Sequence, residues 1–228
     1  MAVSVDTVYQ RVLAILNKEQ RGYVTPQEFN LFANQAQMDI FEQYFYDINQ
    51  FGRLHGNDTE YSDMLNILNE KINIFEKNGS MTYSNNYWSE PSDLYRMGTI
   101  IYNNIEAERI NANEYLYINA SPLTKPTDAR PIFVASSSGY KVYGANELTS
   151  GVSCNYIKKP AAVNWAYTNV NGQAQYNSTN AIDFELHISE ETELVFKILQ
   201  LAGLSIKELQ VYQVGNQMEG QNTQQEKA

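Results

Sequence analysis

The sequence predicts an α+β protein: a helical bundle, an inserted antiparallel β-rich domain and an extended C-terminal arm. Apolar residues recur at spacings of three and four before residue 79 and again after residue 188, which is typical of amphipathic helices. Between residues 80 and 187 this spacing gives way to short β-prone runs separated by turn-forming residues. Residues 206–228 end in a polar, Gln-rich stretch that cannot bury enough apolar surface to fold alone. We therefore expect a bundle from residues 1–79 and 188–205, a β-rich insertion over 80–187 and an arm over 206–228.

The first two helices have the clearest local signals. Residues Val5 to Lys18 carry an apolar stripe on one helical face. The next helix begins at a capping box, in which the Thr25 hydroxyl and the Glu28 carboxylate each satisfy the other residue's backbone amide. Pro26 suits the first helical position, where the missing N–H has no partner to lose. The second helix is expected to continue with a wide aromatic face to about Ile48.

Two further helices are expected in the bundle. The third follows the turn at residues 56–58, and Asn78-Gly79 would end it. The fourth begins at Ser189, with glutamates in its first turn that complement the helix dipole, and Gly203 would close it.

The β-rich insertion contains six short runs that favour strands. They are Thr99–Tyr102, Tyr115–Ile118, Pro131–Val134, Tyr140–Tyr143, Val152–Ile157 and Val163–Val170. Asn171-Gly172 is the strongest hairpin signal, because both residues tolerate the positive φ of a type I′ turn. The pattern fits a small sandwich or a barrel and does not separate the two.

Composition argues against several classes of function. The formal net charge of the 228 residues is −10, and the 16 Lys and Arg residues are scattered, so a surface that grips nucleic acid is not expected. No apolar run approaches the ~20 residues of a membrane span, and no secretion signal is apparent. The 17 Tyr residues suit half-buried surfaces such as interfaces, or a Tyr-rich sheet.

No catalytic or cofactor motif emerges from the sequence. His55 and His187 do not have the spacing of metal ligands, and phosphate-binding glycine loops are absent. Cys154 lies in an alternating strand pattern and is expected to be a buried structural thiol. Nothing selects a carboxylate pair such as Glu106 and Glu108 for acid–base work. We expect no enzymatic activity, no cofactor and no metal.

Three stretches together resemble a known group of virion proteins. They are NKEQRGYVTPQEFNLFANQAQMDIFEQYF at 17–45, the middle segments SPLTKPTDARPIFV at 121–134 and CNYIKKPAAVNW at 154–165, and DFELHISEETELVFKILQLAG at 183–203 with its Gln-rich tail. Their order resembles the ring or adaptor proteins of the head-to-tail connector in short-tailed, crAss-like bacteriophages. The resemblance spans most of the chain, and its motifs are structural.

This resemblance implies a structural protein of the virion neck. Connector adaptors form rings, commonly of twelve copies, that dock under the portal protein, contact other neck or tail proteins and extend the conduit for the genome. DNA would pass through without sequence-specific binding, and the protein would assemble in the bacterial cytoplasm. A terminal arm often reaches a neighbour in this group. We therefore expect an assembly interface at Ile206, Leu209, Tyr212, Val214 and Met218.

Two other classes of function stay open at this stage. One is a receptor- or glycan-binding tail module, in which Trp88 and Trp165 would stack on sugars, although packing in a core or an interface is the favoured interpretation of both. The other is a small hydrolase, which would need a convergent polar pocket that the sequence does not indicate.

Overall fold

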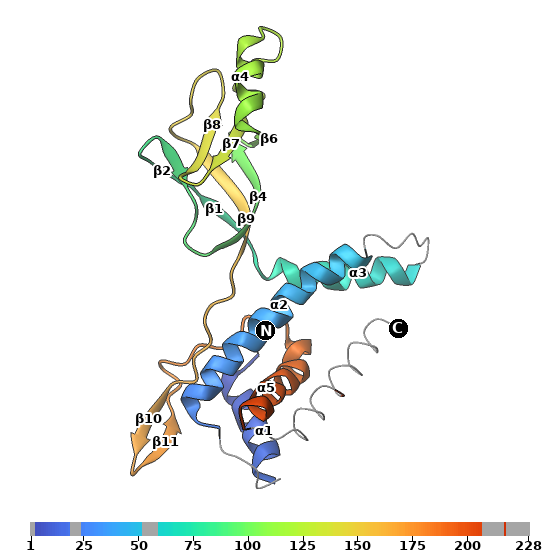
Figure 1. Cartoon of the computed structure of the whole chain (residues 1–228), viewed down its shortest axis with the longest axis vertical. Helices are drawn as coiled ribbons and strands as arrows, with labels where there is room; N and C mark the ends of the chain where they lie inside the picture. Colours follow the sequence, from blue (N-terminus) through green and yellow to red (C-terminus); the bar gives the residue numbers. More distant parts are fainter. Residues whose placement is uncertain (1–2, 19–23, 52–58, 207–216, 218–228) are drawn as a thin grey trace. The chain divides into compact units, whose positions relative to one another are not determined.

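The computed structural model describes residues 3–18, 24–51, 59–206 and 217, although the side chains of residues 17, 18, 51, 59–64 and 204–206 lie outside the described parts (Figure 1). The chain divides into two compact units, residues 1–74 with 160–228 and residues 75–159. One unit is mainly helical and the other mainly β. The predicted α+β class is confirmed, since helices and largely antiparallel sheets occur together.

The helical unit is built on one long central helix. Its helical elements are α1 (Val5–Lys18), α2 (Pro26–Phe51), α3 (Thr59–Asn73), the 3₁₀ turn η1 (Ile188–Glu190) and α5 (Glu191–Ile206). Helix α2 packs against α3 and α5, and α1 packs against α5. The fully buried side chains of this core come from α1, α2, α5 and the segment before η1, and the largest are Phe29, Phe41, Phe184, Ile40, Leu186, Leu194 and Ile198.

The predicted start of α2 is confirmed in detail. The Thr25 amide donates to Glu28 Oε2 at 2.9 Å, and the Glu28 amide donates to Thr25 Oγ1 at 3.3 Å. Pro26 is the first helical residue. The hydrogen bond from the Thr25 amide is the main cause that lowers the pKa of the Glu28 carboxyl.

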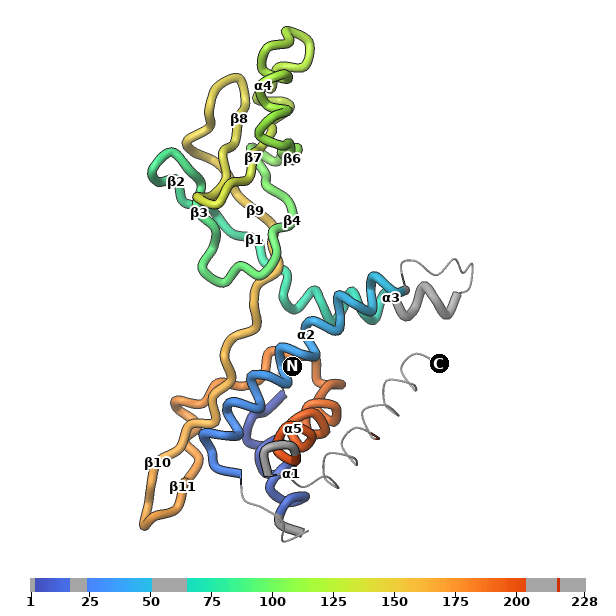
Figure 2. The backbone as a smooth tube through the Cα atoms, in the orientation of Figure 1, coloured from blue at the N-terminus to red at the C-terminus, as the bar shows by residue number. Residues whose placement is uncertain are grey.

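An extended segment, residues 160–166, runs beside α2 (Figure 2). Three amide side chains of that helix hold it. We call these residues the α2 amide ladder: Asn30, Asn34 and Gln37. They follow one another at helical spacing and therefore share one face. Asn30 Oδ1 accepts from the Trp165 amide at 2.8 Å, and Gln37 Nε2 donates to the Ala161 carbonyl at 2.8 Å. A helix thus supplies hydrogen bonds that a neighbouring strand would supply in a sheet.

The segment 160–187 belongs to the helical unit, whereas we expected it in the β-rich insertion. The difference has a physical reason, because the α2 amide ladder and buried Trp165 attach this segment to α1 and α2. It includes the predicted hairpin, formed by β10 (Tyr167–Val170) and β11 (Gln173–Tyr176). At the turn, φ is 53° for Asn171 and 80° for Gly172, which confirms the type I′ prediction.

The β unit contains two sheets. Its strands are β1 (Glu76–Ser80), β2 (Thr82–Ser84), β3 (Tyr87–Ser89), β4 (Leu94–Tyr102), β5 (Ile105–Glu106), β6 (Glu108–Ile110), β7 (Ile132–Ser136), β8 (Gly139–Tyr143) and β9 (Val152–Lys158). One sheet has the order β1-β9-β4-β5 and the other has the order β2-β3-β8-β7-β6.

Single-residue corners join the two sheets along both edges. Met81 separates β1 from β2, and its amide donates to the Val152 carbonyl at 3.3 Å. Ala107 separates β5 from β6, and its amide donates to the Ile100 carbonyl at 2.8 Å. Because each edge strand continues into the other sheet, the unit closes as a small barrel. The corners and the inner faces supply its core: Met81, Trp88, Ile100, Ala107, Phe133, Tyr140, Val142, Val152, Cys154 and Tyr156.

The strand expected at Tyr115–Ile118 is wrong, because these residues lie in helix α4 (Ala112–Ala120). Asn111 precedes the helix, and its amide donates to Glu114 Oε2 at 3.0 Å. Helix α4 connects β6 to β7, which pair in parallel, unlike the other strand pairs of the two sheets. A parallel pair needs a crossover connection, which is longer than a hairpin turn, and α4 lies in this connection.

Two predicted helix ends also differ from the structure. Helix α3 ends at Asn73, and Asn78-Gly79 lie in β1 instead of closing the helix. A Cβ at Gly79 would lie 3.0 Å from Tyr156 Cε1, so glycine allows the Tyr156 ring to pack closely across the β1–β9 pair. Helix α5 begins after η1 and continues through buried Gly203 to Ile206, so Gly203 does not close it.

Candidate assembly surface

The interface predicted in the C-terminal arm lies almost wholly outside the described residues. Ile206 is the last residue of α5, and its side chain is not described. Leu209, Tyr212, Val214 and Met218 lie outside the described residues, as does His55. The role of this segment in assembly therefore stays a prediction.

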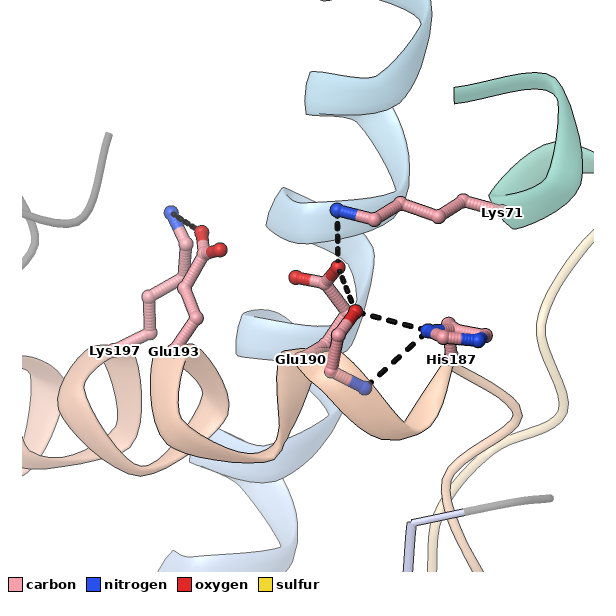
Figure 3. A network of polar contacts seen from close by, with 6 residues as sticks. Lys71, His187, Glu190, Glu193 and Lys197 are labelled. Carbon is pink, nitrogen blue, oxygen red and sulfur yellow. Dashed lines mark hydrogen bonds and ion pairs between the residues drawn. The ribbon is translucent and has the colours of Figure 1, made fainter. Parts of the chain in front are cut away.

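A buried polar network lies at the start of α5 (Figure 3). Lys71 Nζ, from α3, is 2.6 Å from Glu190 Oε1, and the Glu190 side chain is only 1% exposed. The Ser189 hydroxyl donates to the same Glu190 oxygen at 3.1 Å, and His187 Nδ1 lies 2.9 Å from the Ser189 hydroxyl. One turn further along, Glu193 Oε1 lies 3.8 Å from Lys197 Nζ.

This network suits a structural function. A buried carboxylate needs a paired cation and hydrogen bonds to offset its lost hydration, and Lys71 with Ser189 supplies both to Glu190. The Lys71 ammonium also lies 5.6 Å from the centroid of the Tyr44 ring, so the same cation touches α2. The network therefore fixes the start of α5 against α2 and α3, with Glu190 closed to a substrate.

A second polar cluster lies on the β unit. The Tyr156 hydroxyl donates to Asp93 Oδ1 at 2.7 Å, and Lys77 Nζ donates to Asp93 Oδ2 at 2.8 Å. The hydrogen bond from Lys77, followed by that from Tyr156, lowers the pKa of the Asp93 carboxyl. The same bond to Asp93 raises the pKa of the Lys77 ammonium. The cluster holds the loop before β4 against β1 and β9.

The residues considered for sugar stacking or nucleophilic chemistry are buried. Trp88 and Trp165 are 3% and 2% exposed, which confirms the interpretation of both as packing residues. The Trp165 indole N–H donates to Asp6 Oδ1 at 2.9 Å, and the Trp88 indole N–H donates to the Leu148 carbonyl at 2.9 Å. Cys154 is 0% exposed, and burial raises the pKa of its thiol, so the reactive thiolate is disfavoured.

The barrel wall contains a pocket of about 480 Å³ beside the Ala107 corner. We call it the barrel pocket. Met97 and Phe133 contribute apolar surface, while Glu106 and Glu108 lie at its edge as exposed side chains. On its β8 side the Tyr140 hydroxyl donates to Glu90 Oε1 at 2.9 Å. Burial, with this hydrogen bond, raises the pKa of Tyr140 to about 12, so its phenol stays a donor at neutral pH.

Helix α4 presents its apolar side chains to solvent. On one face Tyr115 stacks on Tyr143 of β8, with ring centroids 4.2 Å apart. On the other face Leu116 is 68% exposed and Tyr117 is 79% exposed, and Leu123 in the following turn is 93% exposed. We call these three residues the α4 tip. A crossover helix normally buries its apolar face on its sheet, yet no residue of α4 is buried.

Sequence reasoning missed the α4 tip because it assigned α4 to a strand. A signal was available in Asn111 and Glu114, which have the spacing of a capping box just before an apolar run. In a strand, Leu116 and Tyr117 would point to opposite faces and attract no attention. In helix α4 they lie next to each other on the exposed face.

Helices able to cross a membrane are not found within the described ranges, because none is both long and apolar enough. In the same ranges no group of three or more His, Cys, Asp or Glu side chains could hold a metal ion. No protein-family model matches the chain, and a search of curated proteins finds no match to it.

Proposed function

We propose that the chain is a structural virion protein that forms a ring in the head-to-tail connector of a short-tailed phage. In this proposal it docks to the portal protein and extends the conduit for DNA. Two observations support this proposal. The sequence resembles connector adaptors, and the chain combines a helical unit with an inserted β barrel, as that resemblance implies.

The α4 tip is the observation that carries the proposal. Three large apolar side chains within residues 116–123 are each two-thirds or more exposed. Such a concentration of exposed apolar surface marks a surface that contacts another protein. Tyr117 and Leu123 are the most exposed large hydrophobic residues of the described parts. Such a surface has a use in an assembly, where each copy buries it against a neighbour.

The acidic composition supports the same proposal. A net charge of −10 disfavours tight binding to phosphates, which suits a wall along which DNA slides. DNA is thus proposed as a passing partner and not as a ligand.

The alternative function, a receptor- or glycan-binding tail module, has weaker support. Sugar-binding sites commonly use an exposed aromatic ring as a stacking surface, yet Trp88 and Trp165 are buried. Binding of the full-length protein to a glycan array, at positions that depend on Tyr117, would favour this alternative.

The decisive experiment is an assembly assay. The full-length chain is mixed with the portal protein of the phage that encodes it, and the products are measured by mass photometry and negative-stain imaging. We expect rings of this chain on portal rings. Deleting residues 206–228 tests the predicted arm, and we expect lower occupancy with an unchanged circular dichroism spectrum. A chain that stays monomeric at all concentrations, with and without portal, would contradict the proposal.

A further inference from the structure

The turn after α4 carries both an exposed leucine and a positive charge. The Lys125 amide donates to the Ser121 carbonyl at 3.0 Å, which closes the turn with Leu123 at its middle. Leu123 is 93% exposed and Lys125 is also exposed. Within the described residues, Lys125 has no ion pair or side-chain hydrogen bond. Leu123 and Lys125 therefore point a leucine and an ammonium group outward from one short turn.

The barrel pocket has the complementary character. Its apolar lining includes Met97 and Phe133. Its charged lining consists of Glu106, Glu108 and Arg109, which leaves one net negative charge. Neither glutamate has an ion pair within the described part of the chain. A volume of about 480 Å³ is ample for one leucine side chain together with part of its turn. Two carboxylates at the edge can then receive one ammonium group.

We propose that the α4 tip of one copy docks into the barrel pocket of a second copy of this chain. Leu123 fills the apolar part of the pocket, and Lys125 lies between Glu106 and Glu108 of the neighbour. The charges favour a second copy as occupant, because Lys125 can pair with the net negative charge of the pocket lining. Copies with a net charge of −10 repel one another overall, and residues 111–126, which carry one Glu and one Lys, keep that repulsion low at the contact.

This contact is heterologous, because the tip and the pocket are different surfaces of the same unit. Head-to-tail contacts of this kind repeat from copy to copy and close into a ring when the rotation between copies allows it. The inference deepens the proposed function and rests on it, since it supplies the contact between neighbours in the ring. A leucine side chain that enters an apolar pocket is removed from water, which is the source of its contribution to such a contact.

Cysteine cross-linking tests the contact in the full-length chain. Thr124→Cys chains, which keep Leu123 and Lys125, are mixed with Arg109→Cys chains of different mass, which keep both glutamates. The mixture is oxidised, and the products are separated without reductant. We expect the mixed dimer to form roughly tenfold faster than in a control mixture of Leu31→Cys with Arg109→Cys, because docking raises the effective concentration of the two thiols. Leu31 is a matched control, since it is 71% exposed and lies on α2. Native Cys154 is buried and is kept in all chains.

Charge reversal supplies the second measurement. Lys125→Glu, placed in the Thr124→Cys chain, should reduce the mixed dimer, and Glu106→Lys in the Arg109→Cys chain should restore it. The proposal is overturned if the mixed dimer forms no faster than the control, or if Thr124→Cys pairs mainly with itself. It is also overturned if the portal protein, and not a second copy, covers the α4 tip while no mixed dimer forms.

The outcomes separate this inference from the proposed function. Rings on portal without the mixed dimer would leave the connector proposal standing and remove this contact. The mixed dimer without rings on portal would establish the contact between copies and count against the connector proposal.

Discussion

The Asn34 side chain pairs with the backbone of Val163 through two hydrogen bonds. Asn34 Oδ1 accepts from the Val163 amide at 2.8 Å, and Asn34 Nδ2 donates to the Val163 carbonyl at 2.9 Å. Both groups of Val163 are thus satisfied by one helix residue in a partly buried place, where an unpaired backbone group is costly. Asn34 is the centre of the α2 amide ladder and links two segments 129 residues apart in sequence.

Asn34→Ala should therefore destabilise the helical unit by about 2 kcal/mol, because two backbone groups lose their partner at once. Urea unfolding measured by circular dichroism gives the free energy. The matched control is Gln35→Ala on the same helix, whose exposed side chain donates to Asp39 one turn further along, so its loss should change little. Equal effects of the two substitutions would mean that the ladder does not hold the segment.

The buried pair of Lys71 and Glu190 makes a second prediction. Lys71→Met leaves the Glu190 carboxylate, which is 1% exposed, without its cation, and should cost roughly 3–5 kcal/mol. Replacing both residues, as Lys71→Met with Glu190→Leu, should recover most of this loss, because no uncompensated charge remains. Exposed Asn69→Met on α3 controls for the introduced methionine. Thermal unfolding of the parent, the single variant and the double variant gives their stabilities. A double variant that is no more stable than Lys71→Met would contradict this account.

The capping box at α2 predicts a smaller effect. Thr25→Ala removes the hydroxyl that accepts from the Glu28 amide, and should lower the free energy of unfolding by about 1 kcal/mol. Thr25→Ser keeps that acceptor and should stay close to the parent in thermal melts. Equal melting temperatures for the alanine and serine variants would show that the Thr25 hydroxyl contributes nothing to the box.

The sequence predicts those features whose cause is local. The Thr25–Glu28 box and the Asn171-Gly172 turn depend on neighbouring residues alone, and both are confirmed. Two further type I′ turns, at Asn85-Asn86 and Asn103-Asn104, have positive φ at each residue and were not predicted. Asparagine tolerates this conformation less freely than glycine, so an Asn-Asn pair is a weaker signal that needs its flanking strands for support.

Features with a distant cause could not be predicted. Gly79 lies in a strand because β1 pairs with β9, where Cys154 is its partner and the Tyr156 ring packs close to it. No neighbouring residue of Gly79 contains that information. The α2 amide ladder presents the same difficulty, since Asn30, Asn34 and Gln37 suggest an ordinary polar face until the segment at 160–166 is known. The α4 tip and the barrel pocket depend likewise on a parallel β6–β7 pair that sequence patterns do not specify.

The hairpin turn makes a prediction about backbone strain. Gly172 has φ of 80° and open space where a Cβ would lie, so Gly172→Val should destabilise through backbone conformation and not through a clash. A cost of roughly 1–2 kcal/mol is expected for forcing a β-branched residue into this region. Gln173→Val is the matched control, because Gln173 lies in β11, where valine is favoured. Hydrogen exchange of the β10–β11 amides should rise in the first variant only, and unchanged exchange in both would contradict the strain argument.

The Asp93 cluster predicts a pH dependence with a definite sign. Hydrogen bonds from Lys77 and Tyr156 hold the pKa of Asp93 below its ordinary value of 3.8. Its contribution to stability is therefore complete above the unfolded pKa and is lost as the pH falls through the lower folded pKa. The pKa of Lys77 is raised above 10.5, so its contribution persists below that value and is lost as the pH rises through the folded pKa. Across the neutral range both contributions are present.

Asp93→Asn should accordingly destabilise the β unit at pH 7 more than at pH 2, because the native carboxylate loses its contribution as the pH falls below the unfolded pKa and through the lowered folded pKa. Urea unfolding of the parent and the variant at several pH values gives the difference in free energy. The control repeats the comparison in a Lys77→Met, Tyr156→Phe background, which removes both donors and should abolish the pH dependence of the difference. Because the groups are close to solvent, added salt should also shrink the Lys77 part of the effect at pH 7. A difference that stays constant from pH 2 to pH 7 would mean that Asp93 is not held as the charged acceptor of this cluster.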